Sequence, residues 1–313
     1  MHGVDVLIGG RFSEDTRTFS LSLDALPTRV SLHRRACRQM TSGPRSCTTP
    51  YSEVMLHSAR QGSGRPLLLI HGLGSSIDNW NPIIPTLAAE RDVIAVDLPG
   101  CGESAPLTGE TTIATLTDAV EAFIRDEELG DIDLVGSSMG ARMAMEMARR
   151  GHAGTTIALD PGGFWNDRQA AIFGASIKAS VALVRRIQPA LPFLTGNPVG
   201  RTALLAQFSA HPWKLPQDLV LHELRGFKTS TSLDPALNAL IHGPRQEGAP
   251  AGSLKGKVVI GWGRKDKVTA PSEAARATEL FPDATLHWFE NCGHFPHWDQ
   301  PTEAARLILD STG

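Results

Sequence analysis

The sequence contains few cysteines, no long apolar run and no strong excess of either charge, and each absence excludes a class of protein. The four cysteines among its 313 residues are scattered, so they lack the spacing of a disulfide-rich secreted scaffold. No apolar run approaches the roughly 20 residues of a membrane-spanning helix. The formal net charge is only −3, which argues against a general binder of nucleic acids or membrane surfaces. We expect a cytoplasmic globular protein whose partner is a small molecule; the oligomeric state stays open.

Motifs for bound cofactors are missing as well. Neither a G-x-G-x-x-G dinucleotide fingerprint nor a P-loop occurs. His294 and His297 are three residues apart, but no H-E-x-x-H pattern and no cluster of cysteines and histidines with ligand spacing accompanies them. We therefore predict no cofactor and no metal site, and we interpret His297 as a residue that packs a loop.

The first 48 residues differ from the rest of the chain in charge. They contain seven arginines and no lysine against four acidic residues, so this stretch is net positive while the remainder is net negative. No helical period runs through it. We predict a poorly ordered extension over residues 1–48 and assign it no function.

A pentapeptide near the middle of the chain indicates nucleophilic chemistry. Residues 136–140 form a G-x-S-x-G pattern. The apolar run 132–135 before it predicts a buried strand, and the helix formers at 141–150 follow it. A strand, a sharp turn and a helix are the setting of a nucleophile elbow, which exposes the central serine at the top of a sheet. The pattern favours Ser138 as a nucleophile, although ordinary Gly/Ser turns share these letters.

A second motif supplies hydrogen-bond donors. The apolar run 66–70 leads into a glycine-rich turn at 71–76, and such a turn after a buried strand leaves backbone N–H groups free to bind a ligand. Acyl transfer builds negative charge on a carbonyl oxygen, which two such donors stabilise. We expect the N–H groups of Leu73 and Met139 to form this oxyanion hole, and His71 to brace the loop.

An acid and a base follow late in the chain. The predicted strand at 257–263 leads into a loop with Asp266, at the strand end where open α/β sheets keep their chemistry. The last predicted strand, 285–289, leads into a loop with His294. A serine hydroxyl needs an imidazole to take its proton, and the imidazolium needs a carboxylate on its other nitrogen. Asp160 is an alternative acid, but Asp266 has the better local motif.

Together these motifs resemble those of the α/β-hydrolase superfamily. The resemblance covers about residues 52–162 and 250–313 and rests on five motifs: H-G-x-G at 71–74, D-L-P-G-C-G-E-S at 97–104, G-S-S-M-G at 136–140, G-R-K-D at 263–266 and G-H at 293–294. It implies a serine hydrolase, similar to esterases and lipases, in which Ser138, Asp266 and His294 form a catalytic triad in the family order. Relatives often carry histidine where this chain has Ser137.

Alternation of strands and helices predicts the fold class. Apolar runs at 54–57 and 93–96 indicate further strands, and residues 111–126 have the apolar spacing of a helix. Such alternation is typical of an α/β protein with a mostly parallel central sheet flanked by helices. We expect this α/β-hydrolase core at 49–162 and 249–313.

The segment 163–248 interrupts the alternation and is helical in character. In the superfamily that the chain resembles, an insertion at this point is usually a lid over the serine; a surface insertion that does not touch substrate is the alternative. Aromatic side chains of this helical cap are candidates to line an apolar pocket, although each could equally be plain cap core: Phe164, Trp165, Phe193, Phe208 and Trp213.

We predict a cofactor-free enzyme that cleaves small or medium apolar carboxylic esters through an acyl-enzyme. Three alternatives stay open: a carbon–carbon bond hydrolase with the same triad, a perhydrolase or lyase, and a protein of this fold that binds a ligand without turnover. Carbon–carbon bond hydrolases of the superfamily often carry H-G-x-G-P-G at the oxyanion loop, whereas this chain has Ser75 and Ser76 at the last two positions.

Overall fold

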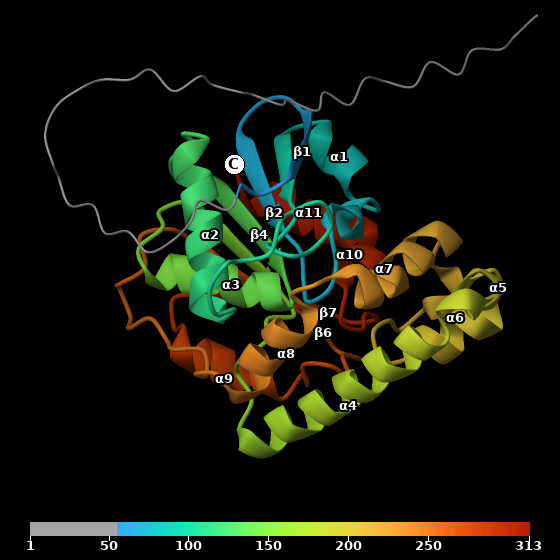
Figure 1. Cartoon of the computed structure of the whole chain (residues 1–313). Helices are drawn as coiled ribbons and strands as arrows, with labels where there is room; N and C mark the ends of the chain where they lie inside the picture. The colour runs from blue at the N-terminus through green and yellow to red at the C-terminus, as the bar shows by residue number, and fades with distance from the viewer. Residues whose placement is uncertain (1–54) are drawn as a thin grey trace, which may run out of the picture.

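A mostly parallel sheet lies at the centre of the protein (Figure 1). The computed structural model describes residues 55–313, and the extension expected over residues 1–48 lies outside them. Within the described residues the sheet has seven strands in the order β1-β3-β2-β4-β5-β6-β7. β1 is antiparallel to β3, and every other pair of neighbours is parallel. The predicted fold class is therefore confirmed, with strands at Ser58–Gly62 (β1), Pro66–Ile70 (β2), Asp92–Val96 (β3), Asp133–Ser137 (β4), Thr156–Leu159 (β5), Val258–Gly263 (β6) and Thr285–Phe289 (β7).

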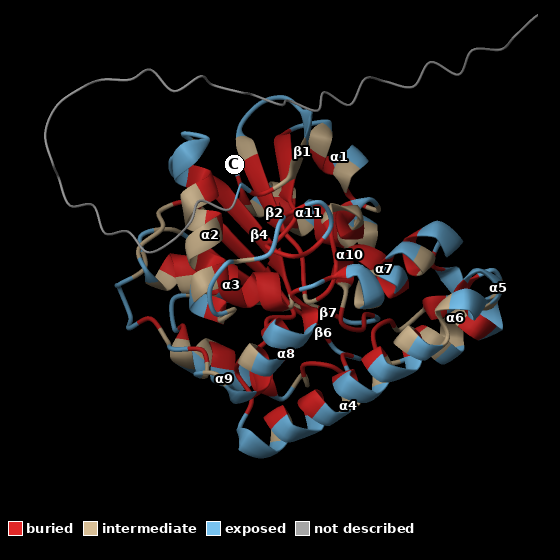
Figure 2. Ribbon diagram, in the orientation of Figure 1, coloured by how far each residue is buried: buried red, intermediate tan, exposed pale blue. Residues whose placement is uncertain are grey.

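The inner strands are buried on both faces (Figure 2). Their apolar runs are continuous rather than alternating because helices cover both sides of a parallel sheet. Leu68 on β2, for example, pairs in register with Ile94 on β3 and Leu134 on β4. The edge strands β1 and β7 are partly exposed. This burial makes the sheet a rigid support for the loops at its carboxyl ends.

Helices pack on the two faces of the sheet. On one face Leu87 of α1 and Ile308 of α11 join a core with Leu67 and Leu69. On the other face α2, α3 and α9 pack against the opposite side chains of the strands. No helix within residues 55–313 has both the length and the apolar character that crossing a membrane requires. The core helices are Ile84–Ala88 (α1), Ile113–Asp126 (α2), Met139–Arg149 (α3), Glu273–Leu280 (α9), Pro296–Asp299 (α10) and Pro301–Ser311 (α11).

A group of helices between β5 and β6 occupies the segment in which we expect a cap. They form a layer beside the core, with the long α4 along its outer edge (Figure 1). The two chain segments that join this layer to the core are hydrogen-bonded to each other, because the N–H of Gln246 donates to the carbonyl of Gly163 at 3.0 Å. The helices are Asp167–Arg186 (α4), Leu191–Thr195 (α5), Pro198–Leu205 (α6), Gln217–Thr229 (α7) and Leu233–His242 (α8).

Two predicted boundaries are wrong. The strand expected at 54–57 begins later, at Ser58, because Ser58 pairs with Val96, the last residue of β3, and earlier residues have no strand opposite them; residue 54 itself lies outside the described part of the chain. The helix expected from residue 111 begins at Ile113. Thr112 caps its N-terminus by accepting a hydrogen bond from the N–H of Thr115 at 3.0 Å.

Candidate active site

Ser138 lies at a strained turn between β4 and α3. Its φ is 57° and its ψ is −112°, a conformation that side-chain-bearing residues rarely adopt. Glycine on either side makes the turn possible, since a Cβ at Gly136 would clash with the backbone of Gly140, and one at Gly140 would clash with the carbonyl of Ile70. The local fold therefore matches the strand, turn and helix that the sequence predicts around this serine.

The structure brings the three predicted side chains together in one hydrogen-bonded row. His294 Nε2 lies 2.8 Å from Ser138 Oγ, and His294 Nδ1 lies 2.8 Å from Asp266 Oδ2. The imidazole and the carboxylate are buried. The backbone N–H of His294 donates a hydrogen bond to the backbone carbonyl of Phe208, a cap residue, at 2.8 Å. Such a row allows an imidazole to take a proton from the hydroxyl while the carboxylate holds the ring.

Backbone and side-chain donors orient the carboxylate of Asp266. Its Oδ1 accepts from the N–H groups of Val268, at 2.7 Å, and Thr269, at 3.1 Å. Its Oδ2 accepts from the Thr269 hydroxyl at 2.6 Å as well as facing the imidazole. The loop after β6 thus aims one carboxylate oxygen at His294 and ties down the other.

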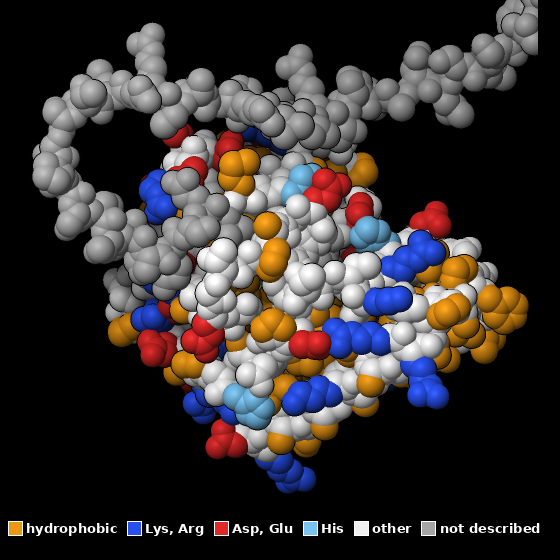
Figure 3. Space-filling view, viewed as in Figure 1, with side chains coloured by type: hydrophobic (Ala, Val, Ile, Leu, Met, Phe, Trp, Pro, Cys, Tyr) orange, Lys and Arg blue, Asp and Glu red, His pale blue; other side chains and the backbone are white. Residues whose placement is uncertain are grey.

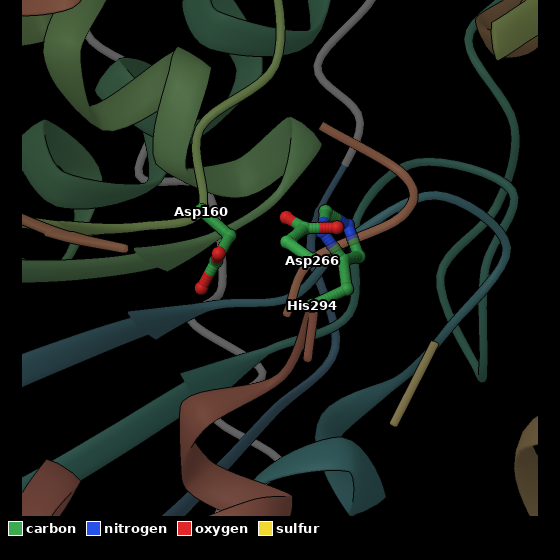
Figure 4. A group of neighbouring side chains, drawn as sticks. All are labelled: Asp160, Asp266 and His294. Atoms are coloured by element: carbon green, nitrogen blue, oxygen red, sulfur yellow. The ribbon is translucent and has the colours of Figure 1, made fainter. Parts of the chain in front are cut away.

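Asp160, the alternative acid, lies beside this row but is bonded elsewhere (Figure 4). Its Oδ1 accepts from the N–H of Gly263 at 2.8 Å. Burial and the charge of Asp266 raise the pKa of Asp160 well above its ordinary range. Asp160, Asp266 and His294 are close enough to share a cation, but both ring nitrogens of His294 already face Ser138 and Asp266. The donor set is therefore arranged for proton transfer rather than for metal ligation.

The glycine-rich turn after β2 passes directly over the serine. A Cβ placed on Gly72 would lie 3.3 Å from Ser138 Cβ, so glycine permits the close approach. His71 is buried and braces the turn, with Nδ1 2.7 Å from the Gly72 carbonyl and Nε2 accepting from the N–H of Leu98 at 3.0 Å. Burial lowers the pKa of His71, which favours the neutral ring that these two bonds require. His71 is thus bonded to the backbone of the turn and of the next loop.

A mostly apolar cavity of about 50 Å³ adjoins Ser138 and His294. Cap helices form much of its wall, and Leu73 of the glycine-rich turn also lines it. Most residues of this wall are not among those that the sequence indicates for the pocket. On α4 the apolar spacing of four residues could have identified Phe173, Ile177 and Val181. The remaining cap residues of the wall are Leu205, Phe208, Glu223, Leu224, Phe227, Leu233 and Leu240.

Of the five aromatic residues proposed for the pocket, only Phe208 lines this cavity. Phe164 packs instead against Trp262 and Phe281, and Trp165 stacks on Phe173 with ring centroids 4.6 Å apart. Both side chains are buried and belong to the packed core rather than to the cavity wall.

Phe193 and Trp213 do not line this cavity either. Their side chains are 79% and 46% exposed, respectively. Hydrophobic side chains also gather on the surface at the α5–α6 end of the cap (Figure 3). An aromatic residue in a helical segment therefore did not by itself indicate the substrate-facing side.

His297 is a packing residue, as its interpretation from the sequence implies. Its Nε2 lies 2.6 Å from Asn79 Oδ1, and its ring lies 4.5 Å from that of Trp80. Burial lowers the pKa of His297 to about 3, so the ring stays neutral. His297 thus joins α10 to the 3₁₀ helix Ile77–Trp80 that follows the glycine-rich turn.

The architecture is that of the α/β-hydrolase fold: a mostly parallel sheet, covered by helices on both faces, with a serine at the tight turn between a central strand and the next helix. The chain belongs to the Alpha/beta hydrolase family, whose sequence profile matches residues 67–307.

Relatives of known name differ in their chemistry. The chain is 30% identical over 257 residues to the dihydrolipoyllysine-residue acetyltransferase component of the acetoin cleaving system from Pseudomonas putida, covering 79% of this chain but only 63% of that relative. It is 27% identical to 2-hydroxy-6-oxo-6-phenylhexa-2,4-dienoate hydrolase from Burkholderia cepacia, covering 83% of this chain and 91% of the relative. A thermophilic esterase from Thermogutta terrifontis has the same fold, with a TM-score of 0.65, 21% identity, and coverage of 84% and 94% of the two chains.

Proposed function

We propose that this protein is a serine hydrolase that cleaves carboxylic esters with small to medium apolar acyl groups. The observation that carries the proposal is the row from Ser138 through His294 to Asp266, with 2.8 Å at each junction, beside an apolar cavity. Membership of a hydrolase family supports it.

In the proposed reaction His294 Nε2 takes the proton of the Ser138 hydroxyl as Oγ attacks the ester carbonyl carbon. The N–H groups of Leu73 and Met139 stabilise the oxyanion of the tetrahedral intermediate. His294 then gives the proton to the leaving alcohol, and an acyl group remains on Ser138. Water, deprotonated by His294, releases the acid and restores the serine. Asp266 keeps the ring oriented and balances its charge in both halves of the reaction.

We also propose that α4–α8 act as a lid. Cap residues form most of the wall of the apolar cavity beside Ser138. Movement of the cap, or of the side chains that line the cavity, would widen the entrance for an ester. Closure over the bound ester would then exclude water from the acyl transfer.

Labelling with a fluorophosphonate and turnover of p-nitrophenyl esters of increasing acyl length test the proposal. The wild-type protein should be labelled once and should show an optimum in acyl length. Ser138→Ala should abolish both signals. Ser137→Ala is the matched control, because Ser137 is the preceding serine and its buried hydroxyl has no hydrogen-bond partner within the described residues; it should keep both. Labelling at a residue other than Ser138 would refute the proposal.

A carbon–carbon bond hydrolase is the second candidate, favoured by the similarity to the Burkholderia cepacia dienoate hydrolase over nearly the whole length of that relative. The absorbance of 2-hydroxy-6-oxo-6-phenylhexa-2,4-dienoate should fall on addition of the protein if this is correct. Labelling of Ser138 with turnover of this compound and of no ester would decide for it.

The remaining alternatives have their own signatures. Faster acyl transfer to hydrogen peroxide than to water would indicate a perhydrolase. Labelling of Ser138 without any turnover would favour a ligand-binding role.

A further inference from the structure

An acidic side chain of the cap lies in the wall of the active-site cavity. Glu223 on α7 is only 6% exposed and lines the cavity together with Ser138 and His294. Its neighbours on the same face of the helix, Leu224 and Phe227, line the cavity as well. The other cap residues of this wall are apolar, so Glu223 occupies a position where the helical pattern calls for an apolar residue.

The carboxyl group of Glu223 is directly connected to the glycine-rich turn. Ser75 Oγ donates a hydrogen bond to Glu223 Oε1 at 3.0 Å. Ser75 also lines the cavity, and it follows Leu73, the proposed oxyanion donor, by two residues. Ser75 and Glu223 line the same small cavity as Leu73 and Ser138, so the pair faces the space proposed for the acyl group next to the scissile carbonyl.

The carboxyl group of Glu223 accepts one hydrogen bond from Ser75, and the Asn79 side chain also lies against it, which leaves part of its bonding capacity unused. A carboxylate can accept about four hydrogen bonds, and a buried polar group with too few partners is costly. Burial raises the pKa of Glu223 to about 7, although the side chains of Ser75 and Asn79 oppose the rise. A purely apolar substrate would leave the group poorly satisfied, whereas a substrate hydroxyl would donate to it.

We propose that Glu223 and Ser75 form a subsite that binds a hydroxyl group on one of the two acyl carbons nearest the scissile carbonyl. The inference rests on the proposed ester hydrolysis and narrows its substrate class to 2-hydroxy or 3-hydroxy acyl esters. Glu223 acts here as a specificity-determining residue, since it contacts the substrate but takes no part in the proton transfers of Ser138 and His294.

Matched pairs of esters test the subsite. Ethyl 3-hydroxybutyrate is compared with ethyl 3-methylbutyrate, and ethyl 2-hydroxybutyrate with ethyl 2-methylbutyrate, so that a methyl group replaces the hydroxyl in each pair. Above pH 7, where Glu223 is ionised despite its raised pKa, the wild-type protein should prefer the hydroxy ester of one pair by about 10- to 100-fold in kcat/KM, the range expected for one hydrogen bond to a charged group. Glu223→Leu should abolish that preference, and Glu223→Gln, which keeps one acceptor oxygen, should retain part of it.

Asp218→Asn is the control, because it removes an exposed carboxylate from the same helix; it should preserve the preference. Ser75→Ala should reduce the preference without removing Glu223. Equal loss of activity on both members of a pair in Glu223→Leu would mean that the residue only supports the glycine-rich turn, and would overturn the proposal. Absence of any preference in the wild-type protein would overturn it too.

Binding without turnover separates this inference from the proposed function. The ketones 4-hydroxypentan-2-one and 4-methylpentan-2-one have the shapes of the 3-substituted acyl groups but cannot be hydrolysed. The wild-type protein should bind the hydroxyketone at least about 10-fold more tightly, and Glu223→Leu should bind the two equally. If no ester is cleaved but this difference is found, ester hydrolysis is wrong and the subsite stands. If esters are cleaved and neither comparison shows a difference, the subsite is wrong and the hydrolysis stands.

Discussion

Ser138→Gly should give a more stable protein than Ser138→Ala, although both variants lack the nucleophilic hydroxyl. Both also lose the same hydrogen bond to His294. They differ in the Cβ atom, which alanine keeps in a backbone conformation with φ 57° and ψ −112°. Glycine adopts positive φ without this steric penalty. The comparison therefore isolates the backbone strain at the turn.

The expected difference in the free energy of unfolding is about 1 kcal/mol. A residue held in a sparsely populated backbone conformation costs about 1–3 kcal/mol. Relief of this strain in Ser138→Gly is offset by up to about 1 kcal/mol, because glycine gives the unfolded chain more conformational freedom, which is lost on folding. For a chain of this size, with an unfolding entropy of about 2.1 cal/mol/K per residue, 1 kcal/mol corresponds to a rise in Tm of about 1.5 °C. Urea unfolding and calorimetry on the purified variants can resolve such a difference.

Ser137 provides a control in which the difference in stability between the glycine and alanine variants should have the opposite sign. It is the last residue of β4, and it is not among the described residues with positive φ. At this position glycine should be less stable than alanine by about 0.5–1 kcal/mol. The reasoning about strain is refuted if Ser138→Gly is no more stable than Ser138→Ala, or if both serines show the same sign.

Three further outcomes are expected. His294→Ala should lower kcat for p-nitrophenyl acetate by about 10³-fold or more, because the general base is lost, whereas His297→Ala should lower it far less per folded molecule; equal losses would exclude His294 as the base. Phe208→Ala should shift the optimum of an ester series toward longer acyl chains, because Phe208 lines the cavity, and the exposed Phe193→Ala should leave the optimum unchanged; no shift in the first variant would contradict the assigned wall. Finally, burial raises the pKa of Glu223 from 4.5 to about 7, so the native state resists ionisation of this group. The stability that the protonated Glu223 contributes to the native state is fully present below pH 4.5 and is lost as the pH rises through 7. The free energy of unfolding should fall by about 3 kcal/mol more over this range in the wild-type protein than in Glu223→Gln, at about 1.4 kcal/mol per pKa unit; identical pH profiles would contradict the assignment.

The sheet and the three polar side chains could be predicted because each depends on local sequence. Buried parallel strands appear as continuous apolar runs, and the loops after them carry the polar residues. Ser138 is marked by glycine on both sides, where the turn tolerates no Cβ atom. Such local requirements can be recognised in the sequence. The start of β1 at Ser58 cannot be predicted in this way, because it depends on how far the partner strand β3 extends.

The cavity wall could be predicted only in part, because it depends on how the cap packs. Phe173 and Ile177 on α4 face the cavity, whereas Phe193 on α5 is exposed. The apolar spacing within one helix indicates which side is buried, but not whether that side meets substrate or another helix. Glu223 was missed for a related reason: an acidic residue in a polar-looking helix gives no sign of burial until Ser75 is found opposite it.

The choice between the two candidate acids illustrates the same limit at the centre of the site. Asp160 and Asp266 both follow the carboxyl end of a buried strand, and β5 and β6 are direct neighbours in the sheet. Sequence position therefore brings both carboxyl groups to the same edge, and only hydrogen bonding tells them apart. Asp160 accepts from the N–H of Gly263 and so fastens the end of β5 to the last residue of β6. Asp266 faces the imidazole of His294. Burial and the charge of Asp266 raise the pKa of Asp160, so Asp266, which faces the ring, is the carboxyl group placed to balance an imidazolium.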